Sequence, residues 1–128
     1  MNIWESYVTA FHRAFDHPVA EKPTPLDPET RALRLALIEE ELDELSNALY
    51  NEDLVETADA LGDLIYVVVG TAVASGIPLT PVLDEIQASN MSKVNSDGTV
   101  SYHENGKVRK PDTWTAPNIA QIIEEASR

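Results

Sequence analysis

Two acidic runs in this chain have the residue types and the spacing that could hold divalent metal ions. The first covers residues 39–45 and reads Glu-Glu-Glu-Leu-Asp-Glu-Leu. On a helical wheel, Glu41 falls roughly 40° from the apolar stripe of this segment, and Glu44 falls roughly 100° from the centre of that stripe. Glu40 lies further round toward solvent. Glu41 therefore occupies a position at which a purely solvated side chain is not expected.

The second acidic run consists of Glu56, Asp59 and Asp63, spaced at i, i+3 and i+7. On a helix this spacing brings the three side chains within roughly 60° of one another, on a face whose later turns are apolar. Burying like charges without partners is costly, whereas a hard divalent cation such as Mg²⁺ removes the cost because it selects oxygen ligands. The helix dipole explains acids at a helix start, but Asp63 lies well inside the helix. Together with Glu41 and Glu44, this run indicates a metal site.

The apolar periodicity predicts the elements that would position these acids. Expected helices cover residues 3–16, 28–50, 80–92 and 117–125, and a further helix begins near Glu52 or Asp53 and continues to Gly76. A small hairpin is expected over residues 99–110, with a type I′ turn at Asn105-Gly106. We therefore predict a single all-α domain over residues 1–128, built as a helical bundle with a small C-terminal hairpin.

The expected third helix is apolar on nearly every side in its second half. A helix of this kind must be buried all round, which one short chain achieves with difficulty. We therefore expect a homodimer or a dimer of dimers in which helices of different copies pack together. The longest apolar stretch, residues 64–77, is too short to predict a membrane span, and the first residues do not resemble a signal peptide. A cytoplasmic protein with no membrane partner is expected.

Charge and composition exclude several functional classes. The chain has 22 acidic and 9 basic residues, a formal net charge of −13. A nucleic acid polymer is not an expected partner, since phosphate contacts need clustered Lys and Arg. The absence of cysteine excludes disulfides and thiolate metal sites. An acidic protein that binds a polyphosphate needs metal ions to bridge the like charges.

One basic cluster lies near the C-terminus and consists of Lys93, Lys107, Arg109 and Lys110. Lys93 and Lys110 are predicted to hold substrate phosphates opposite the metals, whereas the other two cations are predicted to flank the hairpin. Asn90 is a candidate for hydrogen bonding to a sugar or a base. Trp114 has two alternatives, stacking on a base or packing on the bundle.

Several of these segments resemble a known superfamily. The MazG-like all-α nucleotide pyrophosphohydrolases, which include phosphoribosyl-ATP pyrophosphohydrolase and the dimeric dUTPases, carry an EExxE motif that residues 40–44 resemble. Their ExxD motif is similar to Glu56-Thr57-Ala58-Asp59, although a ligand set shifted to Asp59 and Asp63 stays open. The C-terminal signature of the phosphoribosyl-ATP-like branch is similar to Asn90-Met-Ser-Lys93 and the later Lys110-Pro111.

The resemblance implies the all-α NTP pyrophosphatase fold and hydrolysis of a nucleoside triphosphate, with dUTP among the candidates, to a monophosphate and pyrophosphate. Four carboxylates would hold Mg²⁺, or Mn²⁺ in its place, namely Glu41, Glu44, Glu56 and Asp59. Glu40 or Asp63 would orient or deprotonate the attacking water. Two alternatives stay open. One is phosphoribosyl-ATP pyrophosphohydrolase in histidine biosynthesis, and the other is a non-catalytic helical assembly module whose acids are merely solvated.

Overall fold

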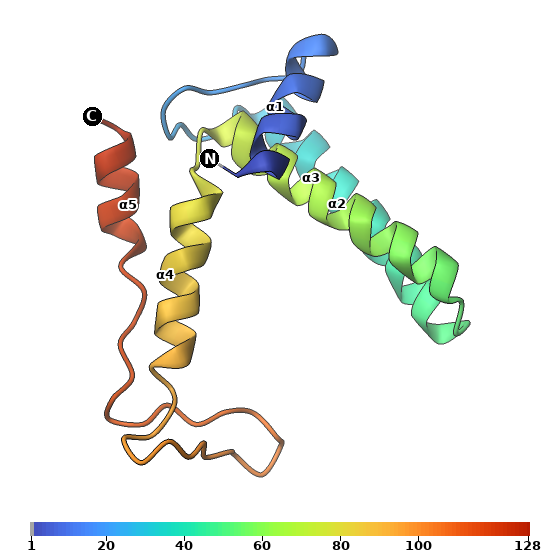
Figure 1. Ribbon diagram of the computed structural model, residues 1–128. Helices are drawn as coiled ribbons and strands as arrows, with labels where there is room; N and C mark the ends of the chain where they lie inside the picture. Colours follow the sequence, from blue (N-terminus) through green and yellow to red (C-terminus); the bar gives the residue numbers. More distant parts are fainter. Residues whose placement is uncertain (1) are drawn as a thin grey trace. The chain divides into compact units, whose positions relative to one another are not determined.

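The computed structural model describes residues 2–128 and shows five α-helices and no β-strand over that range (Figure 1). The helices are α1 (Ile3–Ala14), α2 (Pro28–Tyr50), α3 (Leu54–Ser75), α4 (Leu79–Met91) and α5 (Ile119–Ala126). The predicted all-α fold is confirmed. The chain divides into two compact units, Met1–Leu79 and Thr80–Arg128, which are described one at a time. A single domain over residues 1–128 stays a prediction.

Capping side chains fix the ends of the two long helices. Asp27 begins α2, because its Oδ1 accepts a hydrogen bond of 2.8 Å from the backbone N–H of Thr30. Asp53 begins α3 in the same way, with a bond of 3.1 Å from the N–H of Glu56. Gly76 ends α3 in the left-handed conformation, at a φ of 69°. These starts and stops agree with the sequence prediction to within two residues.

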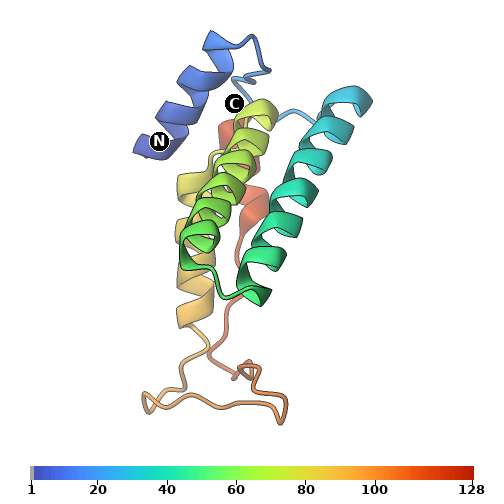
Figure 2. The same ribbon diagram turned by 90° about the vertical axis from the view of Figure 1, so that its right-hand side faces the viewer.

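The α2–α3 pair is the centre of the first unit. The two helices lie side by side and run in opposite directions, joined by a turn at residues 51–53 (Figure 2). In the turn, Glu52 takes a φ of 54°, and the N–H of Asp53 donates to the carbonyl of Ala48 at 3.1 Å. Ala48 and Ala60 are buried where the helices face each other, so small side chains allow a close approach. This short turn sets which residues of α2 face which residues of α3.

Helix α1 packs on α3 through Val8 and His12, which are 1% and 2% exposed. The Nδ1 atom of His12 lies 2.8 Å from the carbonyl oxygen of Pro18. A proline carbonyl can only accept, so His12 Nδ1 carries the proton and donates. Burial lowers the pKa of His12, and the nearby positive charge of Arg34 lowers it further. The ring is therefore a neutral, structural part of the core.

A buried arginine ties α2 to α3. Arg34 is 5% exposed; its Nε donates to Thr71 Oγ1 at 3.1 Å, and its Nη2 donates to the carbonyl of Val67 at 2.7 Å. Gly70 makes room for this guanidinium. A Cβ at that position would overlap Arg34 and lie 2.9 Å from His12 Nε2. Glycine is thus required here by close packing.

One flank of α3 is left uncovered in the part of the chain that the structure describes. Leu61, Ile65 and Val68 share a helix face and are all exposed, Ile65 by 61%. By length and composition α3 is also the one helix within residues 2–128 that could cross a membrane, although the core helix of a soluble protein meets the same criteria.

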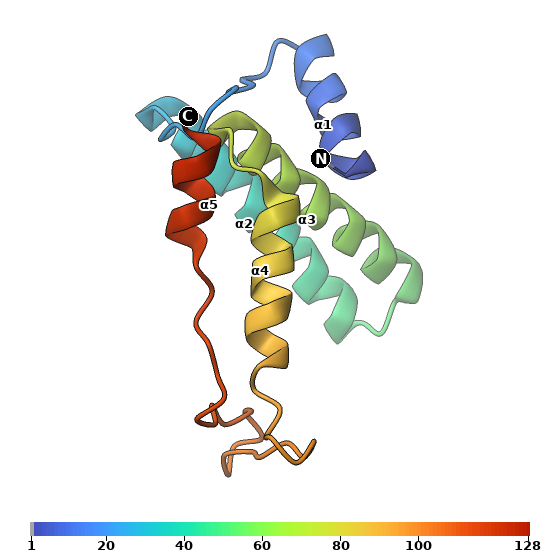
Figure 3. The same ribbon diagram turned by 60° about the vertical axis from the view of Figure 1, so that its left-hand side comes forward.

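The second unit consists of α4, a long loop and α5, which runs alongside α4 (Figure 3). Glu85 on α4 accepts a hydrogen bond of 2.9 Å from the N–H of Asn118, the residue that caps α5. The predicted hairpin is reduced to one antiparallel bridge, between Tyr102 and Val108. The predicted type I′ turn is wrong. That turn needs a positive φ at both central residues, and of the two only Gly106 has one.

Candidate metal centre

The acidic run on α2 turns one carboxylate inward. Glu41 is half-buried, whereas Glu40 and Glu44 on either side of it are exposed. Its Oε2 atom is buried and has no hydrogen-bond partner among residues 2–128. The helical wheel of the sequence predicted this inward placement. An unpartnered buried carboxylate oxygen is costly in a folded protein unless a cation binds it.

A residue of α3 meets this carboxylate. Glu41, Glu44 and Asp63 each place one carboxylate oxygen within 4.8 Å of the other two, and we call these residues the three-acid group. Burial raises the pKa of Glu41, and the negative charges of Glu44 and Asp63 raise it further. Three carboxylates this close together favour either protonation of one acid or a bound cation.

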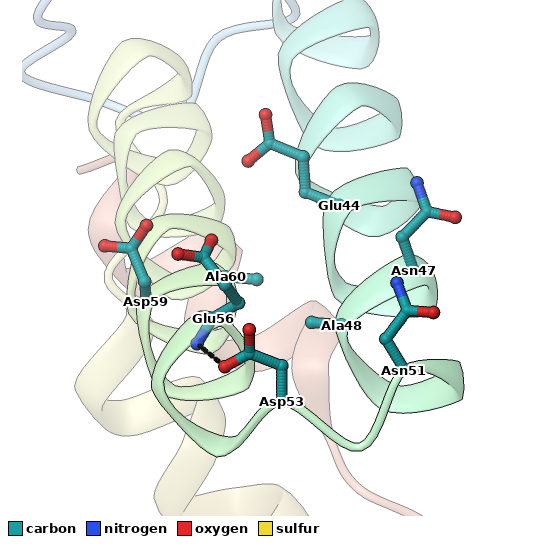
Figure 4. Close-up of a pocket in the computed structure, with 8 residues that line it drawn as sticks. All are labelled: Glu44, Asn47, Ala48, Asn51, Asp53, Glu56, Asp59 and Ala60. Atoms are coloured by element: carbon teal, nitrogen blue, oxygen red, sulfur yellow. Dashed lines mark hydrogen bonds between the residues drawn. The ribbon is translucent and has the colours of Figure 1, made fainter.

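A pocket of about 470 Å³ opens beside the three-acid group, toward the α2–α3 turn (Figure 4). Its lining residues are Glu44, Asn47, Ala48, Asn51, Asp53, Glu56, Asp59 and Ala60. Glu56 and Asp59 project from α3, on the opposite side of the pocket from the two asparagines of α2, and Glu44 extends from α2 toward α3. Because Glu44 belongs to both features, the pocket and the three-acid group form one continuous acidic site.

The predicted acids therefore fall into three places. Glu41 and Glu44, predicted as metal ligands, lie together, and Asp63, predicted as a catalytic residue, lies with them. Glu56 and Asp59, also predicted as ligands, are exposed residues of the pocket and lie outside the three-acid group. Glu40 is exposed next to Glu41 and contributes to the raised pKa of Glu41. The chemical role of each acid stays a prediction.

Sequence reasoning missed three polar residues of the pocket. Asp53 has a structural task, since it caps α3. Asn47 and Asn51 are exposed, their side chains make no hydrogen bond to any of residues 2–128, and both residues line the pocket from α2. Their positions could have been found from the sequence. They follow Glu44 at i+3 and i+7, which is the same helix face.

The acidic site fits a hard divalent cation. It offers only oxygen ligands, and Glu41 Oε2 is a buried acceptor that has no donor in the described chain. Mg²⁺ and Mn²⁺ favour carboxylate oxygen and complete their coordination with water or substrate oxygen. The exposure of Glu44 and Asp63 leaves space for such additional ligands.

The predicted substrate-binding residues all belong to the second unit and form two pairs. Lys93 Nζ donates to Asn90 Oδ1 at 3.0 Å, so these two side chains, three residues apart, hold each other. Lys110 Nζ lies 4.5 Å from the ring centroid of Trp114, a cation–π contact. Trp114 is half-buried in this arrangement. Its ring face is thus covered by a cation of its own chain.

The remaining predicted cations line a separate hollow. A cavity of about 410 Å³ is bordered by His103, Lys107, Val108, Arg109 and Lys110. The Nε atom of Arg109 donates to the carbonyl of Tyr102 at 3.1 Å, across the hairpin. Arg109 therefore flanks the hairpin as predicted, while Lys110 shares the same cationic surface.

Comparison with known proteins yields one family and one relative. The family model described as phosphoribosyl-ATP pyrophosphohydrolase matches residues 8–90, well over half of the chain. The match includes α2 and α3, with all of the acids described above. "Uncharacterized protein L479" of Acanthamoeba polyphaga mimivirus is 42% identical over 76 residues, which is 56% of this chain. The aligned part is only 30% of that relative, so the chain spans under a third of its length.

Proposed function

Because the chain belongs to the phosphoribosyl-ATP pyrophosphohydrolase family, we propose that it hydrolyses a nucleoside triphosphate to a nucleoside monophosphate and pyrophosphate. Pyrophosphohydrolase chemistry, the cleavage of an acid anhydride in a nucleotide-like substrate, follows from family membership. The Mg²⁺ requirement and the choice of a nucleoside triphosphate, with dUTP among the candidates, are our additions. One observation supports them most strongly, namely that Glu41 approaches Glu44 and Asp63 within 4.8 Å and also has a buried oxygen without a hydrogen-bond partner among residues 2–128.

The residues of the acidic site have distinct proposed tasks. Bound Mg²⁺, with Mn²⁺ as a substitute, would neutralise phosphate charge and lower the pKa of a water molecule. Glu41 and Glu44 would hold the ion, and Glu56 and Asp59 would extend the ligand set along the pocket. Asp63 has two proposed roles, as a further ligand or as an acid that orients water.

The proton of the attacking water is proposed to pass to an acid that does not bind the ion. Glu40 is exposed beside Glu41 and is proposed as the general base. As the water oxygen bonds to phosphorus, its proton passes to this carboxylate, and the bond between phosphorus and the bridging oxygen breaks. The products are the monophosphate and pyrophosphate.

The pairs of the second unit are proposed to bind the substrate. Lys93 and Lys110 supply positive charge for phosphate, and their present partners, Asn90 and Trp114, are neutral groups that a phosphate can displace. Asn90 would then be released to hydrogen bond to a sugar or a base. No residue of this set makes an ion pair within residues 2–128, so no acid of the described chain competes for the two lysines.

Phosphoribosyl-ATP is the second candidate substrate, because it fits the matched family equally well. Both substrates contain the same phosphoanhydride bond next to a nucleoside, so the acidic site serves either. A non-catalytic assembly module is less well supported, since a merely solvated acid would not have a buried carboxylate oxygen without a partner, as Glu41 has.

Self-association and a cytoplasmic location are also proposals. Leu61, Ile65 and Val68 form an exposed apolar strip on α3, and covering such a strip with a second copy would remove it from water. A homodimer, or a dimer of dimers, satisfies this requirement without a membrane.

The proposed activity is tested by measuring pyrophosphate release from the common ribonucleoside and deoxyribonucleoside triphosphates and from phosphoribosyl-ATP, with Mg²⁺ and with EDTA. We expect metal-dependent release from at least one substrate and its loss in Glu44→Gln. Glu39→Gln is the matched control, because Glu39 is an exposed acid of α2 outside the acidic site. Metal-dependent release that survives in Glu44→Gln, or none in the wild type, would contradict the proposal.

A further inference from the structure

The pocket beside the three-acid group has two chemically different sides. On one side, α3 contributes the carboxylates of Glu56 and Asp59 (Figure 4). On the other side, α2 contributes the neutral amides of Asn47 and Asn51, which lie next to each other. The floor between them is made of the small residues Ala48 and Ala60. A ligand in this pocket therefore meets anionic groups on one side and neutral hydrogen-bonding groups on the other.

The two amides have unused hydrogen-bonding capacity. Each asparagine side chain offers one acceptor oxygen and two N–H donors, and neither side chain bonds to any of residues 2–128. Asn51 is the C-cap of α2 and has an ordinary right-handed backbone, at a φ of −85° and a ψ of −1°, so its conformation does not require asparagine. Asn47 lies inside the helix, where asparagine is a weak former. Both side chains are exposed, so a ligand in the pocket can reach them.

The position of the amides relative to the acids suggests which part of a ligand they meet. Asn51 follows Glu44 by seven residues, so it lies about 10 Å further along the axis of α2. The three-acid group lies at the far end of that distance and suits metal-bound phosphates, which carry all the negative charge of a nucleotide. Glu56 and Asp59 line the pocket together with the amides. A nucleoside is the neutral remainder of the same molecule, and its base edge and sugar hydroxyls match the donor and acceptor set of an amide.

We propose that Asn47 and Asn51 bind the nucleoside part of the substrate and determine which nucleotide this chain prefers. The inference rests on the proposed nucleotide hydrolysis and adds two specificity-determining residues to it. A hydrogen bond between an amide and the preferred nucleoside gives discrimination, because a substrate that lacks the matching group forgoes that bond. The edge of a base and a sugar hydroxyl can both hydrogen bond to an amide. Substrates that differ only in the base or only in the sugar distinguish the two.

The test measures kcat/KM for a panel in which either the base or the sugar varies alone. The proteins are the wild type, Asn47→Ala, Asn51→Ala and the double variant, with Ser46→Ala as the matched control. Ser46 is exposed on α2 and does not line the pocket. Thermal melting with and without Mg²⁺ checks that each variant is folded and still binds metal.

We expect each asparagine variant to lose about tenfold in kcat/KM for the preferred nucleotide, the size of one lost hydrogen bond. For the poorest nucleotide kcat/KM should change little, so the ratio of kcat/KM between the preferred and the poorest nucleotide should fall. Loss of discrimination across bases assigns the amides to the base, and loss between ribose and deoxyribose assigns them to the sugar. A double variant that hydrolyses the panel with the preferences of the wild type and of Ser46→Ala overturns this inference while the proposed function stands. A wild-type protein that hydrolyses no nucleotide overturns both.

Discussion

Removing one charge from the three-acid group should change the stability of the protein in opposite directions without and with Mg²⁺. Glu41→Gln keeps the size of the side chain and abolishes its repulsion by Glu44 and Asp63, whose oxygens lie within 4.8 Å. At that distance two unit charges repel by about 1 kcal/mol in water and by about 3.5 kcal/mol at an effective dielectric constant near 20. Since Glu44 and Asp63 are exposed, the lower value applies. Two such repulsions predict that, without metal, the variant is more stable by about 2 kcal/mol.

Saturating Mg²⁺ should reverse this order. A ligand that binds only the folded state at 100 times its dissociation constant stabilises it by about 2.7 kcal/mol. The wild type gains this stabilisation, whereas Glu41→Gln has lost a charged ligand and gains less. The order reverses if the Mg²⁺ affinity of the variant falls by about 50-fold or more, because the variant then gains less than about 0.7 kcal/mol. The free energy of unfolding is measured by urea denaturation in EDTA and then across a Mg²⁺ titration. Glu39→Gln, an exposed neutralisation on the same helix, should respond to Mg²⁺ as the wild type does.

Two results would refute this reasoning. One is a Glu41→Gln protein that is less stable than the wild type in EDTA, because the three acids would then not repel one another. The other is an equal gain of stability from Mg²⁺ in both proteins, because the ion would then bind elsewhere.

Three further predictions concern the packing of the first unit. Gly70→Ala should lower the free energy of unfolding by about 1–3 kcal/mol, since the added methyl overlaps Arg34. In the control Gly62→Ala the added methyl meets no atom within 4 Å, so this variant should not be destabilised. Urea midpoints compare the two variants, and equal midpoints would contradict the packing described for Gly70. The pKa of His12 is lowered in the folded protein, so stability is fully present above the unfolded-state pKa of about 6.5 and is lost as the pH falls from there through the lower folded-state pKa. The urea midpoint should therefore drop more steeply toward acid in the wild type than in His12→Gln, and parallel pH profiles would exclude this role. Light scattering at micromolar concentration should show a dimer or larger assembly that Ile65→Glu dissociates, and a wild-type monomer would argue against self-association.

Most of the fold was predictable from the sequence because its signals are local. Asp27 and Asp53 before helical segments, and Gly76 after one, act within a single turn of chain, so the bounds of α2 and α3 were predicted closely. The type I′ turn predicted at Asn105-Gly106 is wrong because it also rested on a local preference alone. The local preference favours a type I′ turn, but the loop is closed by other bonds, among them one of 2.7 Å from the N–H of His103 to the carbonyl of Lys107.

The composition of the acidic site was only partly predictable, because it depends on how two helices face each other. The wheel of α2 places Glu41 inward without any knowledge of α3. Which acid of α3 meets it depends on the turn at residues 51–53, where a positive φ at Glu52 sets the offset between the helices. Periodicity contains no such information. The sequence could therefore propose Glu56, Asp59 and Asp63 as candidates, and only the structure groups Asp63 with Glu41.

The location of bound metal tests the central claim most directly. Anomalous scattering from crystals grown with Mn²⁺, a substitute for Mg²⁺ that is visible by this method, would place the ion without reference to any assay. We expect an anomalous peak from Mn²⁺ within coordination distance of the carboxylates of Glu41 and Glu44, with Asp63 beside it. A fully occupied Mn²⁺ site elsewhere on the chain, with these three carboxylates bound only to water, would contradict it.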